Sequence, residues 1–343
     1  MNTFNEWDPL EEVVVGIVDG AQIPRPDPGL YALEFSELPD MSQIPSGPFS
    51  KRVLEETAED LDTLASALSR LSIVVRRPEP IDHGRVFRSL DWESDGFFNY
   101  CPRDTMLVVG DTIIETPMTL RSRQYENLAY RTMLREYMER GGRWISAPKP
   151  RLQDSVYRKS QGFQIAIDES EPIFDAANVA RCGRDLFYLV SDSGNHLGAR
   201  WLASTLGPEY RIHTCDRLRN TIHIDTTLVL VRPGLVLVPA PYVSPDNLPK
   251  ALRSWDVVYV QDVVDHGSSE SLLSSKWVGL NLLMINPSLA VIDRHQQPLI
   301  RELESRSIDT LQLELRHARV LGGGFHCVTL DVRRNGTLES YCG

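Results

Sequence analysis

The chain has 343 residues, of which 42% are hydrophobic and 24% charged, and its formal net charge is −11 at pH 7. This length and composition can bury a large core, and the absence of any linker or low-complexity segment predicts one domain over 1–343. The acidic balance argues against nucleic-acid binding, which needs clustered Lys and Arg. The longest apolar run, Trp277 to Ile285, is about half the length that crosses a bilayer, and the N-terminal residues do not form a signal or transit peptide. We therefore expect a cytoplasmic protein that has neither nucleic-acid nor membrane partners.

The cysteine content excludes two common structural devices. The five cysteines are odd in number, and no two have CxxC spacing. A disulfide framework or a structural zinc site is therefore not expected, and a reducing compartment is the default. The five are Cys101, Cys182, Cys215, Cys327 and Cys342.

Helices alternate with paired strands in the first half of the chain. Apolar residues at helical spacing predict helices, and apolar runs interrupted by turn residues predict strand pairs. In chain order the predicted elements are a helix over Val53–Leu71, strands over Thr105–Val109 and Thr112–Glu115, a helix from Tyr125 to Arg140 that stops at Gly141-Gly142, strands over Asn178–Ala180 and Leu186–Val190 with a turn over Arg181–Asp185 between them, and a helix over Asn195–Leu206.

The second half repeats the same alternation. Its predicted elements are strands over Thr227–Val231 and Leu235–Val238, strands over Leu282–Ile285 and Leu289–Ile292, a short helix over Pro298–Ser305, and a last candidate hairpin with a strand over Cys327–Val332 before a turn over Arg333–Gly336. The paired strands recur at intervals of about 50 residues after a longer first interval. A repeated unit of hairpin and helix favours radial repetition of small sheets around an axis, and an open α/β sheet with hairpins is the alternative. In the radial arrangement, the residues that lead into each hairpin converge at the centre.

The sharpest motif is Leu321-Gly322-Gly323-Gly324-Phe325-His326-Cys327. Three glycines allow a tight turn and a close approach of a ligand to the backbone. A cysteine directly after such a turn is a candidate nucleophile, and a buried structural thiol is the alternative. Cys327 is therefore the first candidate catalytic residue.

Three other leading segments carry a histidine and carboxylates. His223 and Asp225 are two residues apart at the start of a strand and point to one face, which suits a general acid/base beside a carboxylate that grips a cation. Asp175 is a candidate to orient the imidazole of His223, with a helix or turn cap as the alternative. Asp104 follows Pro102-Arg103, and its simpler explanation is a salt bridge with a neighbouring arginine.

The chain resembles the amidinotransferase family from Asn5-Glu6-Trp7-Asp8-Pro9-Leu10 almost to the C-terminus. The segments that carry the resemblance are Pro102-Arg103-Asp104, Ile113-Ile114-Glu115-Thr116-Pro117-Met118, Arg121-Ser122-Arg123, Ala147-Pro148-Lys149-Pro150, Phe174-Asp175-Ala176-Ala177, His223-Ile224-Asp225, Ser274-Ser275-Lys276-Trp277, Gly322–Cys327 and Asp331-Val332-Arg333-Arg334. In length, and in Asp91-Trp92-Glu93-Ser94-Asp95-Gly96, it is most similar to the bacterial members that act in secondary metabolism.

The resemblance implies a five-bladed α/β propeller, the pentein fold, and a transfer of the amidino group of L-arginine through Cys327 to a primary amine, with release of L-ornithine. By position it implies Cys327 as nucleophile, His223 as general acid/base and Asp175 as its partner. Substrate would be bound by Asp104, Asp225, Ser274 and Ser275 around the donor, and by Asn220 and Ile222 on the acceptor side.

The chain differs from the family pattern at one position. Counting without gaps from His223-Ile224-Asp225 places Tyr242 where members such as the vertebrate glycine enzyme have an arginine for the donor carboxylate. Asn220 and Ile222 are closer to the glycine-using pattern than to the inosamine one. A glycine amidinotransferase that makes guanidinoacetate, a guanidino-group hydrolase and a non-catalytic binding protein on the same fold therefore stay as alternatives. No metal or organic cofactor is expected; the expected partners are the two small-molecule substrates, and a homodimer is one assembly that the sequence allows.

Overall fold

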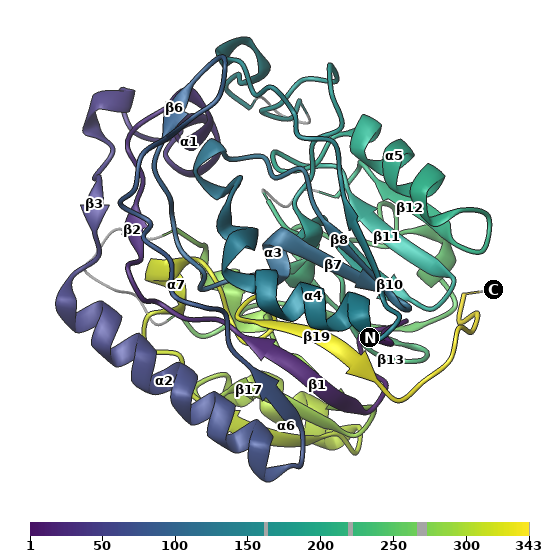
Figure 1. The fold of residues 1–343 in the computed structure, drawn as a ribbon. Helices are drawn as coiled ribbons and strands as arrows, with labels where there is room; N and C mark the ends of the chain where they lie inside the picture. The colour runs from purple at the N-terminus through teal and green to yellow at the C-terminus, as the bar shows by residue number, and fades with distance from the viewer. Residues whose placement is uncertain (161–163, 219–221, 266–272, 343) are drawn as a thin grey trace.

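The computed structural model describes residues 1–160, 164–218, 222–265 and 273–342. Within these ranges the chain forms a mixed α/β fold built mainly from small three-stranded sheets (Figure 1). Asn220, one of the predicted substrate-binding residues, lies outside the described residues.

Five described sheets have three strands each, with one antiparallel and one parallel pairing. Their strands are β1 Leu10–Val15, β4 Val74–Arg76 and β19 Thr329–Arg334; β7 Met106–Val109, β8 Thr112–Glu115 and β9 Arg143–Ser146; β10 Val179–Cys182, β11 Asp185–Leu189 and β12 Arg211–Cys215; β13 Val229–Arg232, β14 Leu235–Pro239 and β15 Asp256–Val260; and β16 Leu283–Asn286, β17 Leu289–Asp293 and β18 Asp309–Leu313. Two-stranded sheets pair β2 Gln22–Ile23 with β3 Gly47–Pro48, and β5 Phe87–Arg88 with β6 Glu93–Ser94.

A crossover connects the two parallel strands of each three-stranded sheet, because parallel strands cannot be joined by a tight turn. The described helices are α1 Pro28–Glu34, α2 Lys51–Arg70, α3 Pro102–Thr105, α4 Arg131–Glu139, α5 His196–Leu206, α6 Gln297–Ser305 and α7 Ala318–Leu321. The described 3-10 helices are η1 Met41–Gln43, η2 Arg121–Arg123, η3 Glu126–Tyr130, η4 Asp154–Val156, η5 Ala176–Asn178, η6 Ile224–Thr226, η7 Lys250–Leu252 and η8 Lys276–Leu280. Helices α2, α4, α5 and α6 lie in four of the crossovers, and η7 lies in the fifth.

The prediction for the last hairpin was wrong. Among the described residues, no second strand of a hairpin follows β19; it pairs antiparallel with β1 instead, and Val13 lies opposite Asp331. The apolar N-terminal segment supplies the missing partner, since Val13, Val14 and Val15 are all buried. The two ends of the chain therefore complete one sheet, as the adjacent purple and yellow strands of Figure 1 show.

The predicted helices agree with the structure with one change at a boundary. Helix α2 buries Val53, Leu61, Leu64 and Leu68 along one face, as its apolar spacing predicts. The segment predicted as one helix from Tyr125 begins instead as η3 and becomes α-helical only in α4. The middle strands β11 and β14 are buried along their whole length, which explains their continuous apolar sequences.

A buried ion network joins β19 to two of the other sheets. Asp331 accepts hydrogen bonds from Arg103 at 2.5 Å, from Arg181 at 2.8 Å and from Arg334 at 2.6 Å. Glu6 accepts from Arg181 at 2.7 Å, and all five side chains are buried. Because Arg103 lies in α3 and Arg181 in β10, this network fixes the segments that lead into separate hairpins relative to one another.

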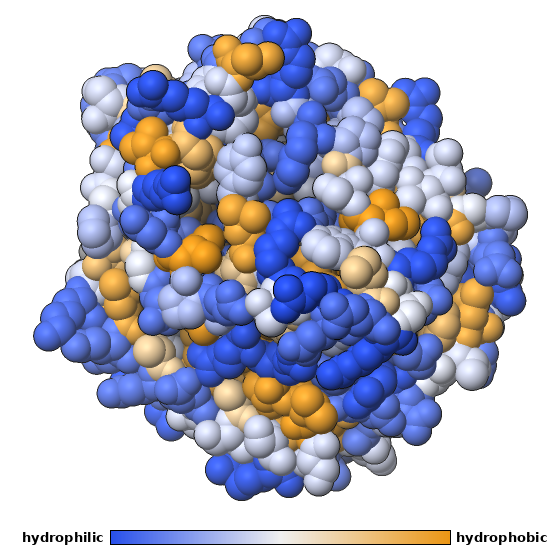
Figure 2. All heavy atoms as spheres, viewed as in Figure 1, coloured by the Kyte–Doolittle hydropathy of each residue, from blue (hydrophilic) through white to orange (hydrophobic). Residues whose placement is uncertain are grey.

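The surface in the view of Figure 2 is mostly hydrophilic, with hydrophobic residues in small separate groups. Of the helices in the described ranges, none has both the length and the apolar character needed to span a bilayer.

Candidate active site

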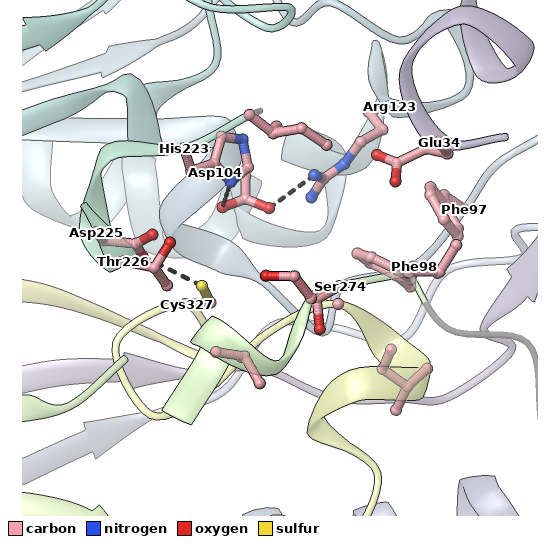
Figure 3. A pocket seen from close by; sticks show the side chains of 16 residues that line it. Glu34, Phe97, Phe98, Asp104, Arg123, His223, Asp225, Thr226, Ser274 and Cys327 are labelled. Atoms are coloured by element: carbon pink, nitrogen blue, oxygen red, sulfur yellow. Dashed lines mark hydrogen bonds and ion pairs between the residues drawn. The ribbon is translucent and has the colours of Figure 1, made fainter. Parts of the chain in front are cut away.

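The segments that lead into four of the five antiparallel strand pairs line one pocket (Figure 3). Asp175, from the segment that leads into the fifth pair, β10 and β11, is hydrogen-bonded to the lining residue His223. The pocket holds about 700 Å³ of empty space, including open solvent at its mouth, which is the size range of small-molecule sites. The described residues that line it are Glu34, Phe97, Phe98, Asp104, Arg123, Ile222, His223, Asp225, Thr226, Leu273, Ser274, Ser275, Val278, Leu321, Gly322 and Cys327.

The glycine-rich turn places Cys327 at this pocket. Gly322 ends α7 with φ of 79°, a left-handed conformation that favours glycine. A Cβ atom on Gly323 would lie 2.6 Å from the sulfur of Cys101, so only glycine fits there. The turn directs the backbone N–H of Cys327 to Asn281 Oδ1, which accepts the hydrogen bond at 2.9 Å.

The Cys327 thiol is protonated in this site. It donates to Asp225 Oδ2 at 3.2 Å. A hydrogen bond with the thiol of Cys101, burial, and the negative charge of Asp225 raise the pKa of the Cys327 thiol well above its ordinary value. The pocket therefore places a thiol beside carboxylates, and a cation bound between them would favour the thiolate.

His223 bridges two carboxylates. Its Nε2 lies 3.2 Å from Asp175 Oδ2, and its Nδ1 lies 3.6 Å from Asp104 Oδ1. Burial alone would lower the pKa of His223, but the charges of Asp104, Asp175 and Asp225 outweigh it and raise that pKa to about 9. Asp175 is held by the backbone N–H of Thr119, which donates to its Oδ1 at 2.9 Å. The imidazole is therefore a cation at neutral pH with a fixed orientation.

Asp104 presents one occupied and one open oxygen. Its Oδ2 accepts from Arg123 Nη1 at 2.7 Å, whereas its Oδ1 is buried, faces His223 Nδ1 at 3.6 Å and has no hydrogen-bond partner among the described residues. Glu126 accepts from the Arg123 Nε at 3.1 and 3.0 Å, so the arginine is shared by two carboxylates. The open Asp104 oxygen is an acceptor suited to a cationic N–H group.

Asp225 completes the acidic side of the pocket. Its Oδ2 lies 3.0 Å from His326 Nδ1, and His326 Nε2 lies 3.2 Å from Glu6 in the buried ion network. Burial would raise the pKa of Asp225, but the hydrogen bond with His326 and the charges of His326 and His223 lower it below its usual range. Asp225 is therefore an anion between Cys327 and His223.

The remaining predicted residues fall into two groups. Ser274, Ser275 and Ile222 line the pocket, and the Ser274 hydroxyl donates to the Arg319 carbonyl at 3.4 Å. Tyr242 is half-exposed, packs edge-on against Trp277 with ring centroids 5.8 Å apart, and is not among the described lining residues. The structure thus brings Ser274, Ser275 and Ile222 to the pocket and leaves Tyr242 beside it.

Sequence reasoning missed several residues of this site. Glu34, Phe97, Phe98 and Arg123 line the pocket, and Asn281 holds the backbone of Cys327. Arg123 lies in a segment that carried the resemblance and could have been chosen from it. The others have no local signal, because single residues in unrelated segments reach the pocket only through the fold.

Several known proteins match this chain along its whole length. No family model matches the sequence. The chain is 50% identical to inosamine-phosphate amidinotransferase 1 of Streptomyces glaucescens over 343 residues, a match that covers 99% of both chains. It is 35% identical to the L-arginine:L-lysine amidinotransferase of Pseudomonas savastanoi pv. phaseolicola over 351 residues, a match that covers 99% of this chain and 96% of the other. The solved inosamine-phosphate amidinotransferase of Streptomyces griseus has a TM-score of 0.98 and 51% identity, over 100% of this chain and 99% of that one.

A more distant structure shares only the fold. The dimethylarginine dimethylaminohydrolase adduct has a TM-score of 0.57 at 12% identity, over 94% of this chain and 99% of that one. The whole-length likeness at 50% identity shows more than the fold, and the chain belongs to the amidinotransferase family of transferases.

Proposed function

We propose that this chain transfers the amidino group of L-arginine to a primary amine through a covalent intermediate on Cys327 and releases L-ornithine. The observation that carries the proposal is the arrangement of Cys327, His223, Asp104 and Asp225 around one pocket, with Asp175 hydrogen-bonded to His223. Nucleophile, general acid/base and cation-binding carboxylates are the groups that this chemistry needs.

We also infer that the five three-stranded sheets surround a common axis as blades of the propeller expected for pentein proteins. Three features support the inference: the shared topology of the sheets, the contribution of four of their leading segments to one pocket, and the closure of the fifth sheet by β1 and β19. Radial repetition places side chains from distant segments beside one another, as the mechanism requires.

Binding of the donor guanidinium would prepare the site for attack. The open Asp104 oxygen and the Asp225 carboxylate accept its N–H groups and hold its carbon toward Cys327. The bound cation offsets the negative charge around the thiol and so lowers its pKa toward the thiolate. Activation is thereby coupled to occupancy of the pocket.

In the first half-reaction the sulfur of Cys327 forms a bond to the guanidinium carbon, and the bond from that carbon to the side-chain nitrogen of arginine breaks. Protonated His223 gives its proton to the departing nitrogen, and Asp175 stabilises the orientation of the imidazole. The thiol proton and the His223 proton both end on the departing nitrogen, so ornithine leaves with an ammonium group, His223 is neutral and the amidino group on sulfur keeps its positive charge.

In the second half-reaction the acceptor amine attacks the amidino carbon and the bond to sulfur breaks. The acceptor ammonium loses two protons in this step: His223, now neutral, takes one, and the sulfur takes the other, which restores the thiol. Because ornithine must leave before the acceptor enters the same pocket, the kinetics are ping-pong. Buried walls around Cys327 limit hydrolysis of the intermediate by water.

The acceptor is inferred to be an amine of the inosamine-phosphate type, used in natural-product biosynthesis. The relatives named for that substrate are 50–51% identical, whereas the vertebrate glycine amidinotransferases are 35–36% identical. The test incubates the protein with arginine and, separately, an aminocyclitol phosphate, glycine or lysine, and measures ornithine and the amidinated product by mass spectrometry. Ornithine without amine-dependent product would refute transfer to these acceptors, and citrulline would identify a hydrolase.

A further inference from the structure

Glu34 is a pocket residue to which the mechanism assigns no role. It is the last residue of α1 and lines the same pocket as Cys327. In Figure 3 the two residues lie on opposite sides of the pocket, with Glu34 beside Phe97 and Phe98 and its carboxylate near the Arg123 guanidinium. Glu34 therefore faces whatever part of a substrate extends away from the reacting sulfur.

The scaffold holds this carboxylate in place. Asp27 caps the start of α1, and its carboxylate accepts hydrogen bonds from the backbone N–H groups of Gly29 at 2.7 Å and Leu30 at 3.0 Å. Leu30 and Phe35 are buried in the core on either side of the helix. Since the helix is fixed at both ends, Glu34 projects from a rigid element.

The Glu34 carboxylate has no direct polar partner in the part of the chain that the structure describes. Among the described residues it forms neither a hydrogen bond nor an ion pair. It also lies at the C-terminal end of a helix, where the helix dipole disfavours a negative charge. A partly buried acid that stabilises neither its helix nor its surroundings is typical of a functional position.

The charges around Glu34 also suit a functional position in the pocket. Burial and the nearby negative charges of Asp175 and Asp104 raise the pKa of Glu34 to about 7, against the lowering effect of His223 and Arg123. Above that pH the pocket holds an anion that a substrate cation can neutralise, whereas Arg123 already shares its charge with other carboxylates.

We propose that Glu34 binds an ammonium group of the substrate at the end of the pocket away from Cys327. The inference rests on the proposed function of the pocket. Two sources have this chemistry: the α-ammonium of the donor in the first half-reaction, and a second amino group of an acceptor in the other. An ammonium on this carboxylate forms charge-assisted hydrogen bonds, whose loss lowers affinity roughly tenfold to hundredfold.

Two truncated donors test the first source. Agmatine keeps the ammonium of arginine and lacks its carboxylate, whereas 5-guanidinopentanoate keeps the carboxylate and lacks the ammonium. The rate of amidino-adduct formation on Cys327 is measured at pH 8 without acceptor, in wild type and Glu34→Gln. If Glu34 binds the donor ammonium, the substitution slows arginine and agmatine roughly tenfold to hundredfold and leaves 5-guanidinopentanoate within about twofold.

Acceptors with one or two amino groups test the second source. Wild type and Glu34→Gln are loaded with the amidino group, freed of donor, and mixed with 1,4-diaminobutane or 4-aminobutanol. A loss confined to 1,4-diaminobutane assigns Glu34 to the acceptor. The inference is overturned if Glu34→Gln slows agmatine and 5-guanidinopentanoate equally and 1,4-diaminobutane and 4-aminobutanol equally. It is also overturned if the substitution slows neither the donor reaction nor the acceptor reaction.

Controls separate binding from folding and from the proposed transfer. Glu37, exposed after the same helix, gives the matched variant Glu37→Gln, which should behave as wild type. The melting temperature of Glu34→Gln at pH 8 should equal or exceed that of wild type, because the substitution removes an unpaired charge. If wild type forms no adduct, the proposed transfer fails, but the role of Glu34 can still be tested by binding. Calorimetry then measures the affinity of agmatine and of 5-guanidinopentanoate for Cys327→Ala and for the double variant Cys327→Ala/Glu34→Gln. If Glu34→Gln changes the affinity for both ligands equally, the proposed role of Glu34 is overturned.

Discussion

The sulfur of Cys327 donates a hydrogen bond to Asp225 Oδ2 at 3.2 Å, so the proposed nucleophile and a proposed cation-binding carboxylate are in direct contact. One guanidinium bound to Asp225 would therefore be placed beside the sulfur that attacks it. The same contact opposes ionisation of the thiol while the pocket lacks a cation, which links activation of the nucleophile to binding of the donor.

The free enzyme should have an unreactive Cys327. Because its pKa is raised, alkylation by iodoacetamide should keep increasing with pH above 9 without a plateau near neutrality. Asp225→Asn removes one of the charges that raise this pKa and should speed the reaction at pH 8. Peptide mass spectrometry measures the rate of alkylation at Cys327, and the Cys327→Ser protein gives the background from the other cysteines. An alkylation rate that reaches a plateau below pH 7 would contradict a protonated thiol.

His223 should make stability depend on pH in the alkaline range. Its pKa is about 9 in the fold, against about 6.5 in an unfolded chain, so the folded protein binds the proton more tightly. The resulting stabilisation is complete below about pH 6.5 and is lost as pH rises through about 9, with a total on the order of 3 kcal/mol. Urea unfolding between pH 6 and 10 measures it. His223→Gln should lack this loss, and parallel curves for the two proteins would refute the raised pKa.

Asp175→Asn should separate chemistry from binding. The amide keeps the size of the side chain but loses the charge that favours and orients the imidazolium, and an equivalent change in a serine protease triad costs about 10⁴ in kcat. We expect adduct formation to slow by roughly 10² to 10⁴ with donor affinity within a few fold. Asp104→Asn is the contrast, since it should weaken donor binding as well. If Asp175→Asn formed the adduct at the wild-type rate, Asp175 would not have the proposed role of orienting His223.

The buried network around Asp331 should be structural. Asp331→Asn leaves Arg103, Arg181 and Arg334 without most of their compensating charge, and breaking a buried pair costs about 3–5 kcal/mol. Urea unfolding at pH 7 should show a loss of this size. Glu339→Gln, on the surface, is the control. A loss below about 1 kcal/mol would mean that water or rearrangement compensates the arginines.

The sequence was sufficient to predict the features that depend on local patterns. Apolar spacing located α2, α5 and α6, and turn residues separated β7 from β8 and β16 from β17. The motif around Cys327 identified a turn whose glycines the structure explains by a left-handed backbone at Gly322 and by the close approach of Cys101 to Gly323.

Other features required the fold. The pairing of β19 with β1 joins residues more than 300 positions apart, and no local pattern encodes it. Glu34, Phe97 and Phe98 reach the pocket for the same reason. Tyr242 was chosen by counting along the chain from His223-Ile224-Asp225; its side chain packs on Trp277, and its contact with substrate stays a prediction.

The most direct test of the proposed mechanism is the mass of Cys327 after incubation with arginine alone. The proposal predicts one amidino group on Cys327, with one ornithine released for each adduct, and regeneration of the free thiol when an amine acceptor is added. An adduct on Cys101, Cys182, Cys215 or Cys342 instead, or transfer to an amine by the Cys327→Ser protein, would contradict it.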